Sequence, residues 1–142
     1  MNNAHLGAEA VRDFVREKYL SRGEWGAQLP KPGLDPVIGS RADYYNTIAF
    51  HHTERPQNES IISLQKTFLD NPRFSDIGYH FVIGVDGAVY EGRSLDYEGA
   101  HIEKNNTGKI GIAITGNFEH NRARKRPKGC QILPVRPTQP PD

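Results

Sequence analysis

Apolar and polar positions alternate at helical spacing along the first twenty residues. The apolar members of this pattern are Val11, Phe14, Val15 and Tyr19, and charged residues separate them. A recurrence every three or four residues places apolar side chains on one face of a helix. We therefore predict an N-terminal amphipathic helix within residues 1–20, lying on the surface of a core.

A strand and a second helix are predicted next. Residues 48–53 (IAFHHT) are β-branched or aromatic at their start, which is typical of a short buried strand. Asn58 can cap the helix that follows. The inward-facing stripe of that helix would consist of Ile61, Leu64, Phe68 and Leu69.

The clearest local signal is a β-hairpin. Two strand-like runs, residues 79–85 and 88–91, are joined by Asp86-Gly87, a dipeptide that favours a tight hairpin turn. A further buried strand is expected over residues 109–117, where small and β-branched residues follow one another. Strands that alternate with helices indicate an α/β domain.

Two segments have no clear periodicity. Residues 21–47 contain three prolines and four glycines and are interpreted as a long ordered loop that Trp25 anchors. Residues 119–142 hold a run of basic residues and five of the ten prolines, so we expect a disordered basic tail. The predicted organisation is thus one domain over residues 1–118, followed by this tail.

Composition narrows the classes of function. The chain has 142 residues, 36% hydrophobic and 25% charged, with a formal net charge of +1. A nearly neutral chain provides no long-range field for nucleic acid. No apolar run approaches the roughly 20 residues of a membrane-spanning helix, and the opening residues do not resemble a secretory signal. Cys130 is the only cysteine, which excludes an internal disulfide. We expect a monomer, and its localisation stays open.

The histidines are the first candidates for chemistry. His51 and His52 are adjacent in the predicted strand, so their side chains should point to opposite faces and should not bind the same ion. One of them could be a metal ligand while the other packs. Spacing alone supports neither role, because the chain has no HxH or HExxH pattern.

A larger set of motifs changes that picture. In chain order these are SRGEWGA (21–27), IAFHHT (48–53), DIGYHFVIGVDGAVYEGR (76–93), GAH (99–101), Asn106 and IGIAITGNF (110–118). In order and spacing they resemble the family of peptidoglycan recognition proteins and zinc-dependent N-acetylmuramoyl-L-alanine amidases, which includes the phage lysozyme-type amidases. The resemblance implies a mixed central β-sheet flanked by helices, here without the C-terminal helix, and a groove for the glycan-linked stem peptide of peptidoglycan.

The resemblance also implies roles for single residues. His51 matches the zinc ligand of the family and Tyr79 its catalytic tyrosine. Positions expected to bind substrate are His52, His80, His101 and Asn106. Zn²⁺ would lower the pKa of a bound water towards about 7 and polarise the amide carbonyl. The alternative for Tyr79 is a packed strand aromatic whose hydroxyl is satisfied.

The chain departs from the family at its end. A catalytic zinc needs three protein ligands, and relatives take the other two from a GHRD…CPG stretch after a long helix, which is absent here. The ending resembles a truncated or out-of-frame terminus. His120 and Cys130 are the alternative metal ligands, although Cys130 could equally be an exposed thiol in the tail.

Three functions therefore stay open. The first is zinc-dependent hydrolysis of the amide bond between the lactyl group of muramic acid and L-alanine. The second is a non-catalytic module that binds muramyl peptides, and the third is an inactive fragment. The same analysis leaves open whether the protein acts on the cell wall or on internalised wall fragments.

Asp76 and Arg93 are a further pair of interest. They lie at the two ends of the longest motif and could form an ion pair near the hairpin. The alternative is that both are solvated loop charges, since exposed pairs contribute only about 0 to 1 kcal/mol.

Overall fold

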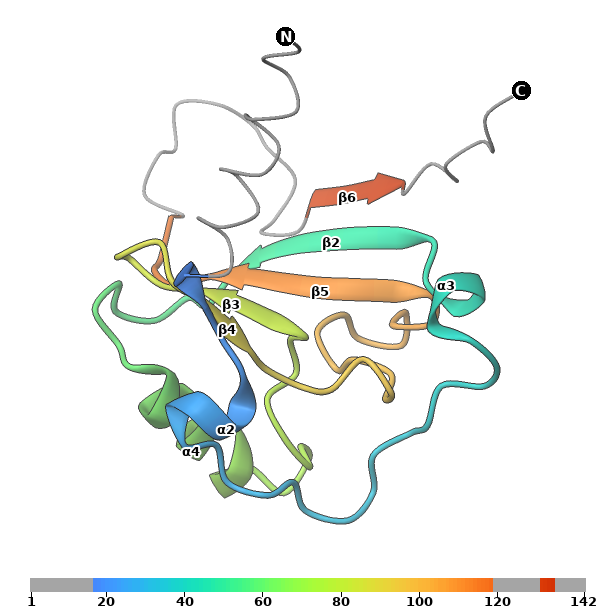
Figure 1. The fold of residues 1–142 in the computed structure, drawn as a ribbon, viewed down its shortest axis with the longest axis horizontal. Coiled ribbons are helices and arrows are strands. Elements are labelled where there is room, and N and C mark those ends of the chain that lie inside the picture. The colour runs from blue at the N-terminus through green and yellow to red at the C-terminus, as the bar shows by residue number, and fades with distance from the viewer. Residues whose placement is uncertain (1–16, 119–130, 135–142) are drawn as a thin grey trace, which may run out of the picture.

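The central feature of the fold is one mixed β-sheet. The computed structural model describes residues 17–118 and 131–134. Within them, six strands pair in the order β1-β4-β3-β5-β2-β6 (Figure 1). The strands are β1 (Tyr19–Leu20), β2 (Thr47–His52), β3 (Phe81–Ile83), β4 (Val89–Glu91), β5 (Lys109–Ile114) and β6 (Gln131–Pro134). The helices are α2 (Arg22–Trp25), α3 (Arg41–Tyr44) and α4 (Ile61–Asp70). This mixed sheet with helices confirms the predicted fold class.

Parallel pairing at the centre of the sheet brings distant motifs together. β5 lies between β2 and β3 and runs parallel to both. The register places His51 beside Ala113 and Phe81 beside Ile112. Residues 62 and 31 positions apart in the sequence therefore lie on neighbouring strands, which is the condition for a shared site.

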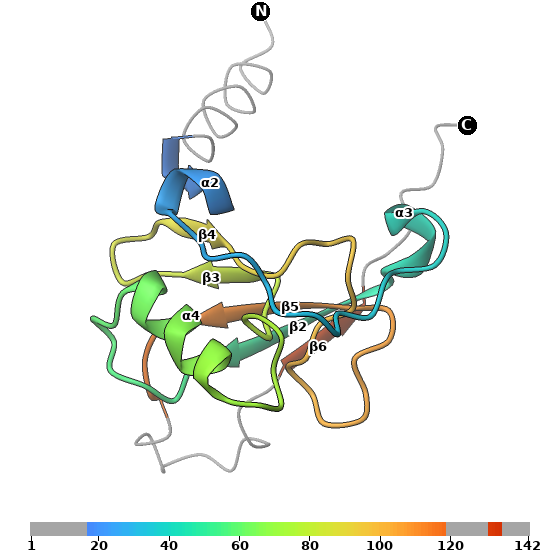
Figure 2. The ribbon, with the colours of Figure 1, turned by 90° about the horizontal axis from the view of Figure 1, so that it is seen from below.

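The core lies between the sheet and helices α2 and α4, which are on the same face of it (Figures 1 and 2). Ala49, Val82 and Ala113 are fully buried on the strands. Trp25, Ile61, Leu64, Ile77 and Val82 form one cluster. Ile61 and Leu64 belong to the predicted inward stripe of α4, and this part of the stripe is confirmed.

Trp25 anchors its loop, as predicted. Its side chain is 8% exposed, and the indole Nε1–H donates to the carbonyl of Glu91 at 2.9 Å. The short helix α2 holds it in place, because the hydroxyl of Ser21 accepts from the amide of Glu24 and Gly26 ends the helix with φ 79°. The predicted loop over residues 21–47 also contains two short helices, α2 and α3, which the sequence pattern did not indicate.

The predicted hairpin is confirmed, with shorter strands. β3 and β4 pair antiparallel, from Phe81 opposite Glu91 to Ile83 opposite Val89. Gly87 has φ 81°, the left-handed conformation that glycine adopts without strain. Asp86 supports the turn, since its Oδ1 accepts from the amide of Ala88 at 3.1 Å.

Three sequence predictions need correction. Tyr19 was expected in the N-terminal helix, but Tyr19–Leu20 form β1 and pair with β4, so backbone pairing overrides the helical period there. Residues 1–16 of that predicted helix lie outside the residues that the structure describes. The N-cap of α4 is Ser60, whose hydroxyl accepts from the amide of Ser63, and not Asn58. Residues Gln131–Pro134, expected to be disordered, form β6 against β2.

The described residues contain no helix that is long and apolar enough to span a bilayer.

Candidate functional site

The two residues with the clearest predicted roles lie together. His51, near the end of β2, places its ring 5.5 Å from that of Tyr79, measured between centroids, with the planes tilted by 44°. Tyr79 also packs edge-on against Phe68 of α4. The structure thus brings a metal-binding type of side chain and a phenol into one site, at the junction of the sheet and α4.

The hydroxyl of Tyr79 is suited to donate a hydrogen bond. Burial, with a smaller effect from the charge of Glu54, raises the pKa of Tyr79 to about 12. The phenol therefore keeps its proton at neutral pH. A protonated hydroxyl beside His51 can stabilise developing negative charge on a ligand oxygen.

His101 is a hydrogen-bond partner of His51. Its Nδ1 lies 2.8 Å from Nε2 of His51, and the two rings meet edge to face with centroids 4.9 Å apart. Burial lowers the pKa of His51, and burial together with the neighbouring His51 lowers that of His101 to about 4. At neutral pH both rings are uncharged.

Asn106 holds the loop that carries His101. Its Oδ1 accepts from the amides of His101 and Ile102 at 2.9 and 2.8 Å. Its Nδ2 donates to the carbonyl of Ile102 at 2.7 Å. The side-chain amide is thus engaged with the backbone of its own loop, and the predicted contact of Asn106 with substrate stays a prediction.

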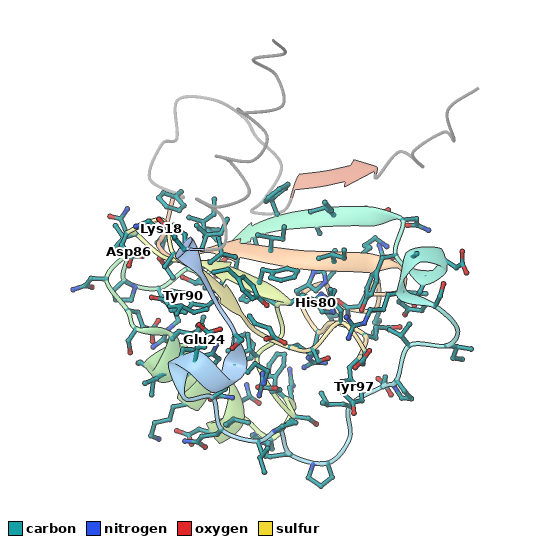
Figure 3. The ribbon with its side chains drawn as sticks, in the orientation of Figure 1. Lys18, Glu24, His80, Asp86, Tyr90 and Tyr97 are labelled. Carbon is teal, nitrogen blue, oxygen red and sulfur yellow. The ribbon has the colours of Figure 1, made fainter. Side chains whose placement is uncertain are left out.

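His80, for which the resemblance implies a contact with substrate, lies in the core. Its side chain is fully buried, on the inner side of the loop that carries Tyr97 (Figure 3). Nδ1 accepts from the amide of Gly111 at 3.0 Å, and Nε2 donates to the carbonyl of Tyr97 at 2.9 Å. Because both ring nitrogens bond to the backbone and the side chain is fully buried, His80 is a core residue in this structure, and its predicted contact with substrate stays a prediction.

His52 points away from His51, as the strand alternation predicted. Its Nδ1 accepts from the amide of Phe118 at 3.1 Å, and its ring lies near that of Phe118. Nε2 lies 3.5 Å from Oε1 of Glu54, too far for a well-formed hydrogen bond. His52 is therefore remote from the face that carries Tyr79, and its predicted contact with substrate stays untested.

A pocket adjoins Tyr79 between α4 and the segment after β2. Its lining residues are Thr53, Arg55, Leu64, Thr67, Phe68, Asn71, Phe74 and Tyr79. The lining combines hydroxyl, amide and guanidinium groups with apolar side chains, which is the composition of sites for small amphiphilic ligands. The sequence pattern did not identify the polar residues of this lining, which are Thr53, Arg55, Thr67 and Asn71. The signal was present, since Thr67 and Asn71 lie four residues apart at the end of the predicted helix.

The described residues supply only part of a zinc site. Neutral His51 is of a type that binds zinc. No group of three His, Cys, Asp or Glu side chains in the described ranges is arranged to hold a metal ion. The other predicted ligands, His120 and Cys130, lie outside the described residues. His51 therefore fits the metal, while completion of the site stays a prediction.

Comparisons with known proteins agree with this geometry. A sequence profile described as N-acetylmuramoyl-L-alanine amidase matches residues 41–139. Peptidoglycan-recognition protein SD of Drosophila melanogaster is 37% identical over 123 residues, which cover 84% of this chain and 66% of the relative. An N-acetylmuramoyl-L-alanine amidase of Sus scrofa is 32% identical, and the match covers 81% of this chain and 21% of that protein.

Solved structures share the fold. The crystal structure of Drosophila peptidoglycan recognition protein SD aligns with a TM-score of 0.62 at 35% identity, covering 72% of this chain and 62% of that one. Peptidoglycan recognition protein LE in complex with tracheal cytotoxin, a monomeric diaminopimelic acid-type peptidoglycan, aligns with a TM-score of 0.59 at 27% identity, covering 70% and 61%. The chain thus spans less than two-thirds of the length of these relatives.

Proposed function

Because the chain belongs to the N-acetylmuramoyl-L-alanine amidase family, we propose that it binds muramyl peptides of peptidoglycan in the pocket beside Tyr79. The observation that carries this proposal is that Tyr79 lines the pocket and also has its ring 5.5 Å from that of His51. A relative with the same fold is described in complex with a peptidoglycan fragment, which supports the ligand class.

The lining of the pocket suits a short peptide on a lactyl group. Phe68 and Phe74 offer an apolar floor to an alanine methyl or an aliphatic stem. Thr67 and Asn71 offer partners for peptide N–H and C=O groups. Arg55 lies at the same site but is paired with Glu59 at 2.5 Å, so a ligand carboxylate must compete with that partner.

A second candidate function is hydrolysis of the amide between the lactyl group and L-alanine. The adjacency of His51 and Tyr79 favours it. Zn²⁺, when bound, would supply an activated water and polarise the carbonyl. His51 would hold the metal, and the Tyr79 hydroxyl, still protonated at neutral pH, would donate a hydrogen bond to the developing oxyanion.

One set of measurements tests both functions. Calorimetric titration of the full chain with muramyl-L-alanyl-D-isoglutamine and with a muramyl tripeptide should give saturable 1:1 binding to a monomer. No heat up to millimolar ligand would contradict the proposal.

Metal analysis and mass spectrometry of the products then test the second function, hydrolysis. One tightly bound zinc per chain, lost in His51→Ala, together with release of L-alanyl peptide, supports it, whereas zinc-free protein that binds but does not cleave restricts the function to recognition.

A further inference from the structure

We propose that Glu59 is a positioning residue, which holds Arg55 so that the pocket prefers a carboxamide to a carboxylate on the stem peptide. This preference rests on the proposed function, since it concerns the same pocket and the same muramyl ligands. Arg55 is the charged member of the described lining residues. What its guanidinium offers to a ligand therefore decides how the pocket treats a negative group.

Glu59 fixes the guanidinium of Arg55 from a buried position. Nε of Arg55 donates to Oε2 of Glu59 at 2.5 Å. The side chain of Glu59 is 7% exposed, whereas that of Arg55 is 39% exposed. Oε1 of Glu59 accepts from the hydroxyl of Ser63 in α4 at 2.9 Å, so the carboxylate is held by the helix. The hydrogen bond from Arg55 lowers the pKa of Glu59, and Glu59 is therefore ionised at neutral pH.

An ion pair that is already formed adds no net charge to the pocket. A carboxylate loses more hydration free energy than a carboxamide on entering such a site, and a neutral pair offsets little of that loss. Because Nε of Arg55 is engaged with Glu59, a ligand carboxylate cannot make the two-point contact through Nε and Nη. It also meets the negative charge of Glu59 behind the guanidinium.

A carboxamide meets no such obstacle. Thr67 and Asn71 line the same pocket and can both donate to and accept from it. Two charges outside the lining have opposite signs. Glu54 acts on Tyr79, and Lys31 donates to the carbonyl of Asn71 at 3.2 Å. The preference therefore depends mainly on the pair formed by Arg55 and Glu59.

The test is calorimetric titration of the full chain with two ligands that differ by one charge. Muramyl-L-alanyl-D-isoglutamine has a carboxamide where muramyl-L-alanyl-D-glutamic acid has a carboxylate, and both keep the distal carboxylate. We expect the parent chain to bind the isoglutamine ligand more tightly, by about threefold. In Glu59→Gln, removal of the negative charge beside Arg55 should shift the ratio of the two dissociation constants by about tenfold toward the glutamic acid ligand.

Asp70→Asn is the matched control. Asp70 pairs with Lys66 at the same spacing of four residues, but both side chains are more than 60% exposed. Loss of this exposed charge should leave the ratio of dissociation constants unchanged. If Glu59→Gln does not fold, Arg55→Gln decides instead. That variant keeps Glu59 and removes the cation, so the ratio should move by about threefold further toward the isoglutamine ligand.

Two kinds of failure are distinguishable. Equal affinities in the parent chain, tighter binding of the glutamic acid ligand, or a ratio that neither Glu59→Gln nor Arg55→Gln changes would overturn the role of Glu59 and leave muramyl peptide binding intact. Absence of binding by either ligand would overturn the proposed function together with the preference.

Discussion

Asp76 forms its ion pair with Arg22, at 2.8 Å between Oδ2 and Nη1, although the two residues are 54 positions apart. The other oxygen, Oδ1, accepts from Nε2 of Gln65 and from the amide of Ile77. Arg93, the partner considered from sequence, donates instead to the carbonyls of Ile77, Glu98 and Asp76. One buried carboxylate thus joins α2, α4 and the segment that leads to Tyr79.

Replacement of Asp76 should be costly to the fold. Asp76 is 1% exposed, so Asp76→Ala removes a buried carboxylate and leaves Arg22 without its charged partner and with only backbone carbonyls as acceptors. We expect a loss of about 3 kcal/mol in the free energy of unfolding, measured by urea denaturation. Asp70→Ala is the matched control, because its pair with Lys66 is more than 60% exposed on both sides and should contribute less than about 1 kcal/mol. Equal losses in the two variants would contradict this account.

Gly92 should not tolerate a side chain. A Cβ at this position would lie 2.3 Å from the carbonyl oxygen of Tyr79, a backbone atom that cannot move aside alone. Gly92→Ala should therefore lower the free energy of unfolding by at least about 2 kcal/mol. Gly23→Ala is the control, since nothing lies within 4 Å of its added Cβ and the residue belongs to helix α2. That variant should be neutral or more stable by up to about 1 kcal/mol.

Stability should depend on pH through His80. Burial, with a smaller effect of Arg93, lowers its pKa in the folded protein to about 4, against 6.5 in an unfolded chain. Between these values the unfolded chain binds more protons, so the free energy of unfolding rises with pH through this window and falls as the pH decreases from 6.5 to 4. Between pH 7 and pH 5, His80 should account for a loss of about 2 kcal/mol.

The variant His80→Asn isolates this effect. Asparagine keeps an acceptor for the amide of Gly111 but does not titrate in this range. Urea denaturation at pH 5, 6 and 7 should show a clearly smaller slope of stability against pH in the variant than in the parent chain. An unchanged slope would contradict the prediction, because it would mean that folding does not change the pKa of His80.

Tyr79→Phe should separate binding from hydrolysis. The change removes the hydroxyl and leaves the ring that packs on Phe68 and His51. In zinc-loaded protein, we expect hydrolysis of a muramyl tripeptide to decrease by about 10²- to 10³-fold while the binding affinity changes by less than about threefold. Chromatography of the products and calorimetry give the two quantities. Tyr90→Phe serves as control, and undiminished hydrolysis in Tyr79→Phe would remove Tyr79 from the reaction.

Local signals in the sequence predicted most of the fold. The hairpin follows from Asp86-Gly87, and the strands that became β2 and β5 follow from their β-branched residues, because these signals act within a few positions. β6 was not predicted, since the pairing of Gln131–Pro134 with β2 depends on an unoccupied edge of the sheet, which no local pattern reveals. For the same reason the strand at Tyr19 was mistaken for the end of a helix.

The candidate site was predictable only in part. Motif order identified His51 and Tyr79, and the structure places them together. Motif order did not reveal that His101 bonds to His51, that His80 is buried, or that Asp76 pairs with Arg22. Each of these depends on which strands and loops become neighbours, so the partner of a polar side chain stays unknown until the topology is known.

The central claim, that muramyl peptides bind beside Tyr79, is tested most directly by titration of ¹⁵N-labelled protein with a muramyl tripeptide. The pocket predicts saturable shifts concentrated on the amides of Thr53, Thr67, Asn71 and Tyr79, with little change in α3. Shifts confined to other parts of the chain, or none at millimolar ligand, would contradict it.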